Sequence, residues 1–393
     1  MNTQFSDRMS DVPKSFIREI LKTTVSPDVI SFAGGLPNRR LFPVQGVKDA
    51  SAHVLDMFGA EALQYATSEG FPELRRWISR RYKERQNLNI HEDNILITAG
   101  SQQGLDLLAK ILLNDGDSVG LEEPGYLGAI QAFALYRPRF RPVPLHFSGL
   151  DIPALEESLQ QHRPKFFYTV PTFQNPSGIS HSNSNRDKAA AVFARYGTLV
   201  VEDNPYGEIQ FSGERFVSYA ARLPEQTVLL GSFSKIFVPG FRIGWIAAPE
   251  RLIEKLTVAK QAADLHTNNF AQRVLYQYLT DNDIDAHIRI ISDAYAQQRD
   301  AMLSAIAREF PVQVQCSNPD GGMFLWAVLP EGVSAREVFD IAITRNVAFV
   351  PGDPFYVDGR RAHTMRLNYS CVDIAGIEEG IARLGAILRK HLG

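Results

Sequence analysis

The chain has 393 residues, a length that suits about two domains of ordinary size. Apolar residues make up 45% and charged residues 22%, as in soluble globular proteins, and the formal net charge of −3 is too small to attract nucleic acid or an anionic membrane over a distance. Cys316 and Cys371 stand far apart, which argues against a disulfide framework or a zinc site. With a polar start and no apolar span, we expect a cytoplasmic protein.

The first 45 residues contain an amphipathic stretch at 15–23 and then a Gly34-Gly35-Leu36-Pro37 segment. Two glycines followed by a proline interrupt regular structure, so we expect a loop that lies close to another part of the protein.

From about residue 46, helical patterns alternate with short β-branched or aromatic runs. Strands separated by helices of this length indicate parallel crossovers, and strands with continuous apolar runs indicate a sheet covered on both faces. We therefore predict an α/β, mostly parallel, doubly wound sheet of seven strands, at residues 94–98, 118–121, 139–145, 165–170, 198–202, 228–232 and 242–247.

Residues 250–308 form helical patterns, one of them long enough to bridge two domains. The tail alternates short strands, near 312–316, 323–329, 348–350 and 364–370, with two helical patterns, at 334–344 and 373–392. We predict a large domain at residues 46–290 and a smaller α+β domain at 291–393, joined by residues 1–45.

The segment Ser232-Phe-Ser-Lys-Ile-Phe-Val-Pro-Gly-Phe-Arg242 places Lys235 near two hydroxyls and an arginine. Burial and a nearby cation both lower the pKa of an amine, as a Schiff-base lysine requires. Ser232, Ser234 and Arg242 would suit a phosphate. A lysine exposed in a loop is the alternative.

Other polar residues follow predicted strands, where doubly wound sheets bind ligands. Ser101 and Gln102 open a helix whose free N–H groups suit an anion, although a plain helix cap would look the same. Tyr126, behind Pro-Gly, could lie flat against an aromatic ring, or it could be an ordinary turn tyrosine.

Four further positions have polar side chains that would need a hydrogen-bond or charged partner. Asn175, in a rigid Asn-Pro loop, could donate to a phenolic oxygen that Tyr206 shares, and Asp203 could pair with a protonated ring nitrogen or cap a loop. Arg366 lies in an apolar strand, where either a structural acid or a substrate carboxylate would serve it.

Together these segments resemble a fold type I pyridoxal-phosphate aminotransferase of the class I and II group, over essentially the whole chain. The matching stretches are SFAGGLPN, QNPSG, EDNPYGEI, the lysine segment and MRLNYS, in this order. The resemblance extends to the branch of 2-aminoadipate, kynurenine and broad-specificity aminotransferases. It implies a pyridoxal 5'-phosphate cofactor, amino acid and 2-oxo acid substrates, and a homodimer with shared active sites.

The resemblance also implies residue roles. Lys235 would hold the cofactor and act as catalytic base, Asp203 would pair with the pyridinium nitrogen, and Tyr126 would stack on the ring. Asn175 and Tyr206 would hold the phenolic oxygen, and Arg366 the substrate carboxylate. The phosphate would be bound by Ser101, Gln102, Ser232, Ser234 and Arg242, with Tyr65 reaching in from the neighbouring subunit.

One sequence feature bears on side-chain specificity. The segment Phe16-Ile-Arg18-Glu-Ile-Leu21 resembles a helix that, in the 2-aminoadipate branch, carries an arginine for a distal carboxylate, so Arg18 is a candidate for acidic substrates. Gly34, Gly35 and Leu36 would line the pocket. We expect transfer from an aromatic, 2-aminoadipate or branched amino acid to 2-oxoglutarate. A lyase or decarboxylase, or a non-catalytic effector-sensing module, are the alternatives, and no metal site is expected.

Overall fold

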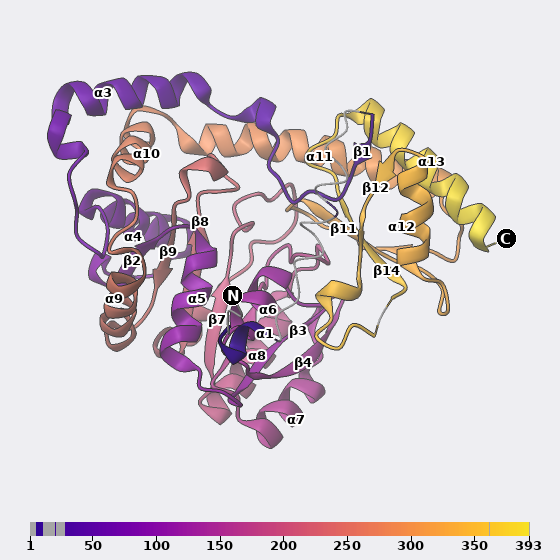
Figure 1. Ribbon diagram of the computed structural model, residues 1–393, viewed down its shortest axis with the longest axis horizontal. Coiled ribbons are helices and arrows are strands. Elements are labelled where there is room, and N and C mark those ends of the chain that lie inside the picture. The colour runs from indigo at the N-terminus through magenta and orange to yellow at the C-terminus, as the bar shows by residue number, and fades with distance from the viewer. Residues whose placement is uncertain (1–4, 11–19, 21–27, 361, 393) are drawn as a thin grey trace.

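The computed structural model describes residues 5–10, 20, 28–360 and 362–392. Figure 1 shows a large sheet with its helices and, to one side, a smaller part built around a second sheet. The long helix α11, Ile284–Glu309, runs from one part to the other. A long helix in this position was expected from the sequence.

The large sheet has the strand order β2-β9-β8-β7-β6-β3-β4-β5. Strands β4, β3, β6, β7 and β8 are parallel, whereas β9 is antiparallel to β8 and β2, and β5 is antiparallel to β4. The bounds are β2 Ile95–Thr98, β3 Ser118–Glu123, β4 Arg139–His146, β5 Gly149–Leu150, β6 Phe166–Thr169, β7 Leu199–Asp203, β8 Thr227–Ser232 and β9 Gly244–Ala247.

Both faces of this sheet are covered, as its apolar strands predict. On β6, Phe166 and Tyr168 join the main core with Phe133, while Phe167 joins a separate cluster beneath α7 and α8. The helices around the sheet are α3 Val44–Ala62, α4 Pro72–Gln86, α5 Ser101–Leu112, α6 Leu127–Ala134, α7 Ile152–His162, α8 Asn183–Tyr196, α9 Glu250–Asp264 and α10 Asn269–Asp281; a short helix, α1 Asp7–Ser10, lies near the N-terminus.

The smaller part contains an antiparallel sheet of order β10-β11-β14-β13 and a two-stranded parallel pair, β1 with β12. Because β1 comes from the N-terminal segment, that pair ties the two ends of the chain together. The bounds are β1 Ile30–Ser31, β10 Gln315–Cys316, β11 Phe324–Val328, β12 Val347–Ala348, β13 Val350–Pro351 and β14 Thr364–Asn368, with α12 Ala335–Thr344 and α13 Ile374–Leu392.

The fold class is confirmed. The large sheet contains the seven predicted strands plus the two-residue β5, which the sequence does not signal because it only closes a tight hairpin on β4. The strand predicted at 312–316 is shorter, since Val312 is 94% exposed and Val314 closes a turn on Pro311. The division at residues 45 and 290 stays a proposal, with the second boundary inside α11. Of the amphipathic stretch at 15–23, only Ile20 is among the described residues.

Candidate active site

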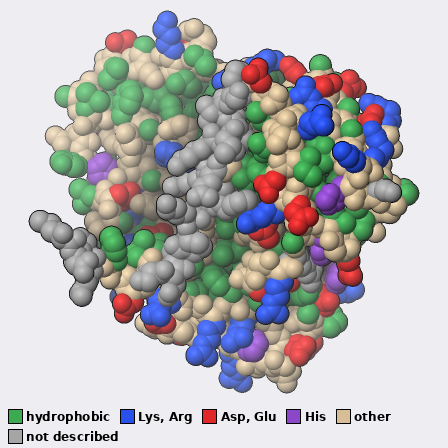
Figure 2. Space-filling view, turned by 45° about the vertical axis from the view of Figure 1, so that its right-hand side comes forward, with side chains coloured by type: hydrophobic (Ala, Val, Ile, Leu, Met, Phe, Trp, Pro, Cys, Tyr) green, Lys and Arg blue, Asp and Glu red, His purple; other side chains and the backbone are tan. Residues whose placement is uncertain are grey.

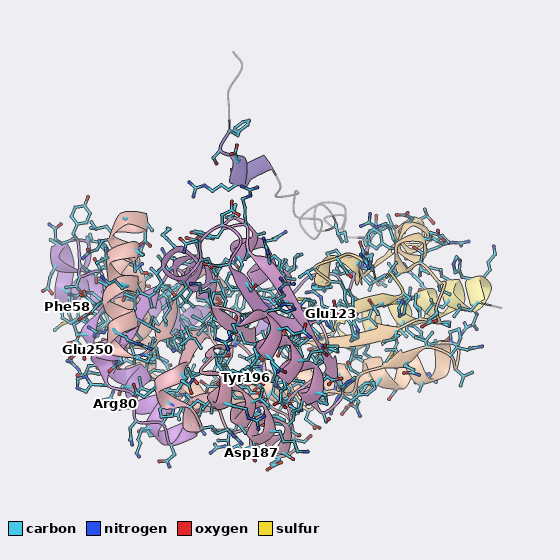
Figure 3. All side chains as sticks on the ribbon, turned by 90° about the horizontal axis from the view of Figure 1, so that it is seen from below. Phe58, Arg80, Glu123, Asp187, Tyr196 and Glu250 are labelled. Carbon is cyan, nitrogen blue, oxygen red and sulfur yellow. The ribbon has the colours of Figure 1, made fainter. Side chains whose placement is uncertain are left out.

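A cavity of about 490 Å³ lies at the carboxyl ends of the parallel strands. Figure 3 shows Glu123, the last residue of β3, on the side of the large sheet that faces the smaller part. Twelve of the site residues predicted from the sequence line this cavity: Gly35, Ser101, Gln102, Tyr126, Asn175, Asp203, Tyr206, Ser232, Ser234, Lys235, Arg242 and Arg366. Segments spread over more than 300 residues of sequence therefore meet in one place.

One end of the cavity is suited to an anion. Helix α5 begins at Ser101 and its N-cap, Gly100, supplies no side chain to cap the first N–H groups. Gly100 has a φ of +79°, and a Cβ there would lie 2.6 Å from Arg242 Nη2, so only glycine lets the guanidinium come this close. Within the described part of the chain, the hydrogen bonds that Arg242 donates are long, 3.4 Å each, to the carbonyls of Ala99 and Pro239. The N–H groups of a helix N-terminus, beside a guanidinium whose hydrogen bonds are weak, favour the binding of a phosphate.

Lys235 lies deeper in the cavity. Its Nζ donates to the Gly35 carbonyl at 2.9 Å and lies 5.8 Å from the centre of the Tyr206 ring. Burial lowers the pKa of Lys235 to about 8; Cys371 opposes this shift, and Arg366 and Arg242 add to it. At pH 7 about a tenth of the amine is therefore uncharged, far more than for an exposed lysine, and a nucleophile and proton acceptor must be in this form.

Asp203 ends β7 with both carboxylate oxygens buried. Tyr168 donates to Oδ2 at 2.8 Å, whereas Oδ1 has no hydrogen-bond partner among the described residues. Burial raises the pKa of Asp203 to about 7; the Tyr168 hydrogen bond opposes this shift, and the charge of Glu122 adds to it. A buried carboxylate oxygen without a donor is costly in a folded protein, so it indicates a missing ligand group such as a protonated ring nitrogen.

Arg366, on β14, faces the large sheet. It donates from Nη1 to Asn175 Oδ1 at 2.8 Å and from Nη2 to the Ala33 carbonyl at 2.7 Å, while its Nε has no partner among the described residues. Asn175 in turn donates to the Tyr206 hydroxyl at 3.4 Å. Burial lowers the pKa of Arg366 to about 10, so the guanidinium stays charged at neutral pH without a carboxylate among these contacts. An anionic ligand would meet that charge.

Tyr65, a predicted site residue, lies away from this cavity. Tyr65 is 78% exposed, packs edge-on against His266 with ring centres 5.7 Å apart, and lines a different cavity together with Phe58 and Arg273. Arg18 lies outside the described residues. The pocket role of Gly35 and Leu36 fits the cavity lining, which does not include Gly34.

Two buried groups beneath the cavity, Tyr168 and Glu122, were not predicted as site residues from the sequence. Glu122 accepts hydrogen bonds from the Val170 backbone at 3.1 Å and from the Gln174 side chain at 3.0 Å, and therefore holds the loop that carries Asn175. It also lies 3.0 Å from His181 Nε2. The only signal was chemical: an acid and a tyrosine in strands otherwise apolar enough to be doubly buried need polar partners.

The donor set fits the cofactor that the resemblance implies. It offers an anion site for a phosphate, the unpartnered Asp203 Oδ1 for a ring nitrogen, the Asn175 and Tyr206 pair for a phenolic oxygen, and an amine for an aldehyde. The described residues contain no group of three or more histidine, cysteine, aspartate or glutamate side chains placed to hold a metal ion. Nor, within those residues, is any helix both long and apolar enough to cross a membrane.

Comparison with known proteins gives concordant matches. The profile of the family "Aminotransferase class I and II" matches residues 28–384. Aromatic-amino-acid aminotransferase 1 of Thermococcus litoralis is 42% identical, over 99% of this chain and 94% of that protein. The 2-aminoadipate transaminase of Thermus thermophilus is 41% identical, over 97% of this chain and 95% of that protein.

A solved structure agrees with these matches. The kynurenine aminotransferase of Pyrococcus horikoshii, in complex with PMP, has a TM-score of 0.95 at 40% identity, covering 99% of this chain and 98% of that one.

Proposed function

The chain belongs to the class I and II aminotransferases and is a pyridoxal-phosphate-dependent aminotransferase, and from this premise we propose that it moves the amino group of an aromatic, 2-aminoadipate or branched amino acid to 2-oxoglutarate. One observation carries this proposal. Among the described residues, one cavity brings together a partly buried amine, a buried carboxylate oxygen without a hydrogen-bond partner and an arginine without a carboxylate partner.

We assign the cofactor contacts as follows. Ser101, Gln102, Ser232, Ser234 and Arg242 hold the phosphate, Asp203 Oδ1 holds the ring nitrogen, Tyr126 covers the ring face, and Asn175 and Tyr206 hold the phenolic oxygen. When bound, the cofactor supplies a ring that withdraws electrons from the substrate α-carbon. The place of these side chains in the cavity lining supports the assignment.

The substrate contacts follow from charge. The Arg366 fork binds the α-carboxylate, which every amino donor and every oxo acid acceptor shares. Lys235 Nζ, in its uncharged form, takes the α-proton and later returns it. Because amino donor and oxo acid use the same site in turn, the pocket must accept two different side chains, and Gly35 and Leu36 at its lining leave room for this.

A donor panel tests the proposal. We expect phenylalanine, 2-aminoadipate and leucine each to yield their oxo acids when 2-oxoglutarate is present, with glutamate formed in equal amount. Product that forms without any oxo acid acceptor would instead indicate lyase or decarboxylase chemistry. Binding of cofactor and amino acid without turnover of any donor would indicate an effector-sensing module.

The same panel tests Arg18, our candidate for a distal carboxylate. An Arg18→Ala variant should lose about 10- to 100-fold in kcat/KM on 2-aminoadipate, because one charge-assisted hydrogen bond is removed, and little on leucine. An equal loss on both donors would reject this role for Arg18.

We further propose that the protein is a homodimer with shared sites. Figure 2 shows apolar side chains gathered at the upper left, the side on which α3 lies in Figure 1. Along and just after α3, Leu55, Met57, Phe58, Leu63 and Tyr65 are all more than 40% exposed. Apolar side chains gathered in this way are typical of a surface that another protein covers, and a second copy would bring its Tyr65 to the neighbouring site.

Mixing two inactive variants tests the sharing. If Tyr65 serves the partner's site, Lys235→Ala and Tyr65→Ala subunits should complement each other, since a mixed dimer contains one complete site. Random mixing should restore about a quarter of the wild-type activity, because half of the dimers are mixed and one of their two sites is complete. No recovery, in a mixture that sedimentation shows to contain dimers, would reject a shared site.

A further inference from the structure

Tyr168 is the one tyrosine of the central strand β6, and its hydroxyl lies under the cavity. Its ring packs edge-on against Phe133, with centres 5.6 Å apart, and its hydroxyl donates to Asp203 Oδ2 at 2.8 Å. Tyr168 and Asp203 are each only 1% exposed. In strand register Tyr168 lies opposite Val201, two residues before Asp203, so the contact is diagonal across neighbouring parallel strands.

This contact makes the two oxygens of Asp203 unequal. Oδ2 is held by the tyrosine, whereas Oδ1 is buried and has no partner among the described residues. A carboxylate with one oxygen fixed cannot turn freely about its terminal bond. The oxygen presented to the cavity is therefore always Oδ1.

The charges around Asp203 give the hydrogen bond a second effect. Burial and the charge of Glu122, on β3, both raise the pKa of Asp203. The hydrogen bond from the Tyr168 hydroxyl lowers it. The other titratable groups that interact with the Asp203 charge are the hydroxyls of Tyr126, Tyr206 and Tyr82, whose own pKa values are raised. With the pKa of Asp203 at about 7, the loss of its one opposing donor would favour the protonated acid at neutral pH.

We propose that Tyr168 is a positioning residue for the transamination, whose hydroxyl orients the Asp203 carboxylate and keeps it ionised so that Oδ1 can hold the protonated ring nitrogen of the cofactor. The proposal rests on the role assigned above to Asp203. Tyr168 would then serve the site through its hydroxyl, while its ring packs in the core between β6 and α6.

The test is the pH dependence of ligand binding, measured without turnover. The probe is 4'-deoxypyridoxine 5'-phosphate, which has the ring nitrogen and phosphate but no aldehyde, so that Lys235 cannot react with it. Its dissociation constant, from quenching of protein fluorescence, should rise as the pH falls and Asp203 becomes protonated. In Tyr168→Phe the midpoint of this rise should move to higher pH by about one unit or more, because a hydrogen bond to a charged group is lost.

Tyr136→Phe is the matched control. Tyr136 also donates to an aspartate, to Asp106 Oδ1 at 3.0 Å, but neither residue lines the cavity. We expect Tyr136→Phe to keep the wild-type midpoint. A Tyr168→Phe midpoint equal to that of the wild-type protein, or an equal movement in Tyr136→Phe, would overturn the proposal.

Two further outcomes are distinguishable. Phenylalanine keeps the packing on Phe133, so Tyr168→Phe should fold, and thermal unfolding of the cofactor-free protein checks this. If it does not fold, Tyr168→Met, with a flexible apolar side chain of similar length, is predicted to show the same movement of the midpoint. If the wild-type protein does not bind the probe at any pH, the cofactor assignment itself fails, whatever Tyr168 does.

Discussion

Replacement of Lys235 by alanine is expected to lower kcat on every donor by about 10⁴-fold or more, because the residue is assigned both the covalent attachment of the cofactor and the transfer of the α-proton. Borohydride reduction followed by mass spectrometry should find the cofactor on the peptide that contains Lys235 in the wild-type protein, and on no lysine in the variant. Lys188→Ala, at an exposed position on α8, is the control and should retain both labelling and turnover. If Lys235→Ala kept wild-type turnover, the assignment of Lys235 as the attachment point and catalytic base would be wrong.

Unfolding is not expected to explain the loss. The pKa of Lys235 is lowered from 10.5 to about 8 in the folded protein, so the unfolded chain binds this proton more tightly. The cofactor-free protein therefore gains stability as the pH rises from 8 towards 10.5, and at neutral pH it bears a cost of about 3 kcal/mol. Lys235→Met, which fills similar space without the charge, should unfold at a higher temperature than wild-type protein at pH 7, and this excess should shrink from pH 8 upwards and vanish well above pH 10.5.

Replacement of Arg366 by alanine is expected to raise KM about 100-fold or more, for the amino donor and for the oxo acid alike. Both substrates present the same carboxylate to the same fork, so the two half-reactions must suffer together. Arg366→Lys keeps a charge but loses the planar pair of donors, and should recover only part of the affinity. Steady-state kinetics with each substrate varied in turn measures both effects.

The control for this prediction is Arg299→Lys. Arg299 also stacks on an aromatic ring, that of Phe211 at 5.4 Å, as Arg366 does on Phe324 at 4.5 Å, but it does not line the cavity. KM values should stay near those of the wild-type protein. A rise in KM for the donor only, in Arg366→Ala, would indicate that the arginine recognises a side chain rather than the shared carboxylate.

The charged groups of the cavity lower the stability of the folded protein when no ligand is bound. Lys235, Asp203 and Arg366 all have pKa values moved by burial towards the neutral form. Among the described residues none of the three has a hydrogen-bond partner of opposite charge, because their hydrogen bonds run to carbonyls, an amide and a hydroxyl. Such groups cost folding free energy and are typical of ligand sites, because the ligand supplies the missing charges.

Local patterns in the sequence were enough to determine the alternation of strands and helices and the end of the strand at which each polar residue stands. The continuous apolar run at Phe166–Thr169 predicted a strand covered on both faces, because side chains alternate between faces and both were apolar. Lys235 and Asp203 were predicted as site residues for a related reason, since the carboxyl ends of parallel strands meet at one edge of the sheet. The motifs then supplied the chemistry by resemblance.

Contacts between distant parts of the chain were decided only by the tertiary structure. Arg366 meets Asn175 across 191 residues, Tyr168 meets Asp203 across 35, and β1 pairs with β12 more than 300 residues away. Local periodicity states whether a side chain is buried, but the partner of a buried hydroxyl or guanidinium depends on strand register and on how the two parts pack. For that reason the sequence alone could name Asp203 as a site residue, whereas the tyrosine that leaves one of its oxygens free appeared only in the folded protein.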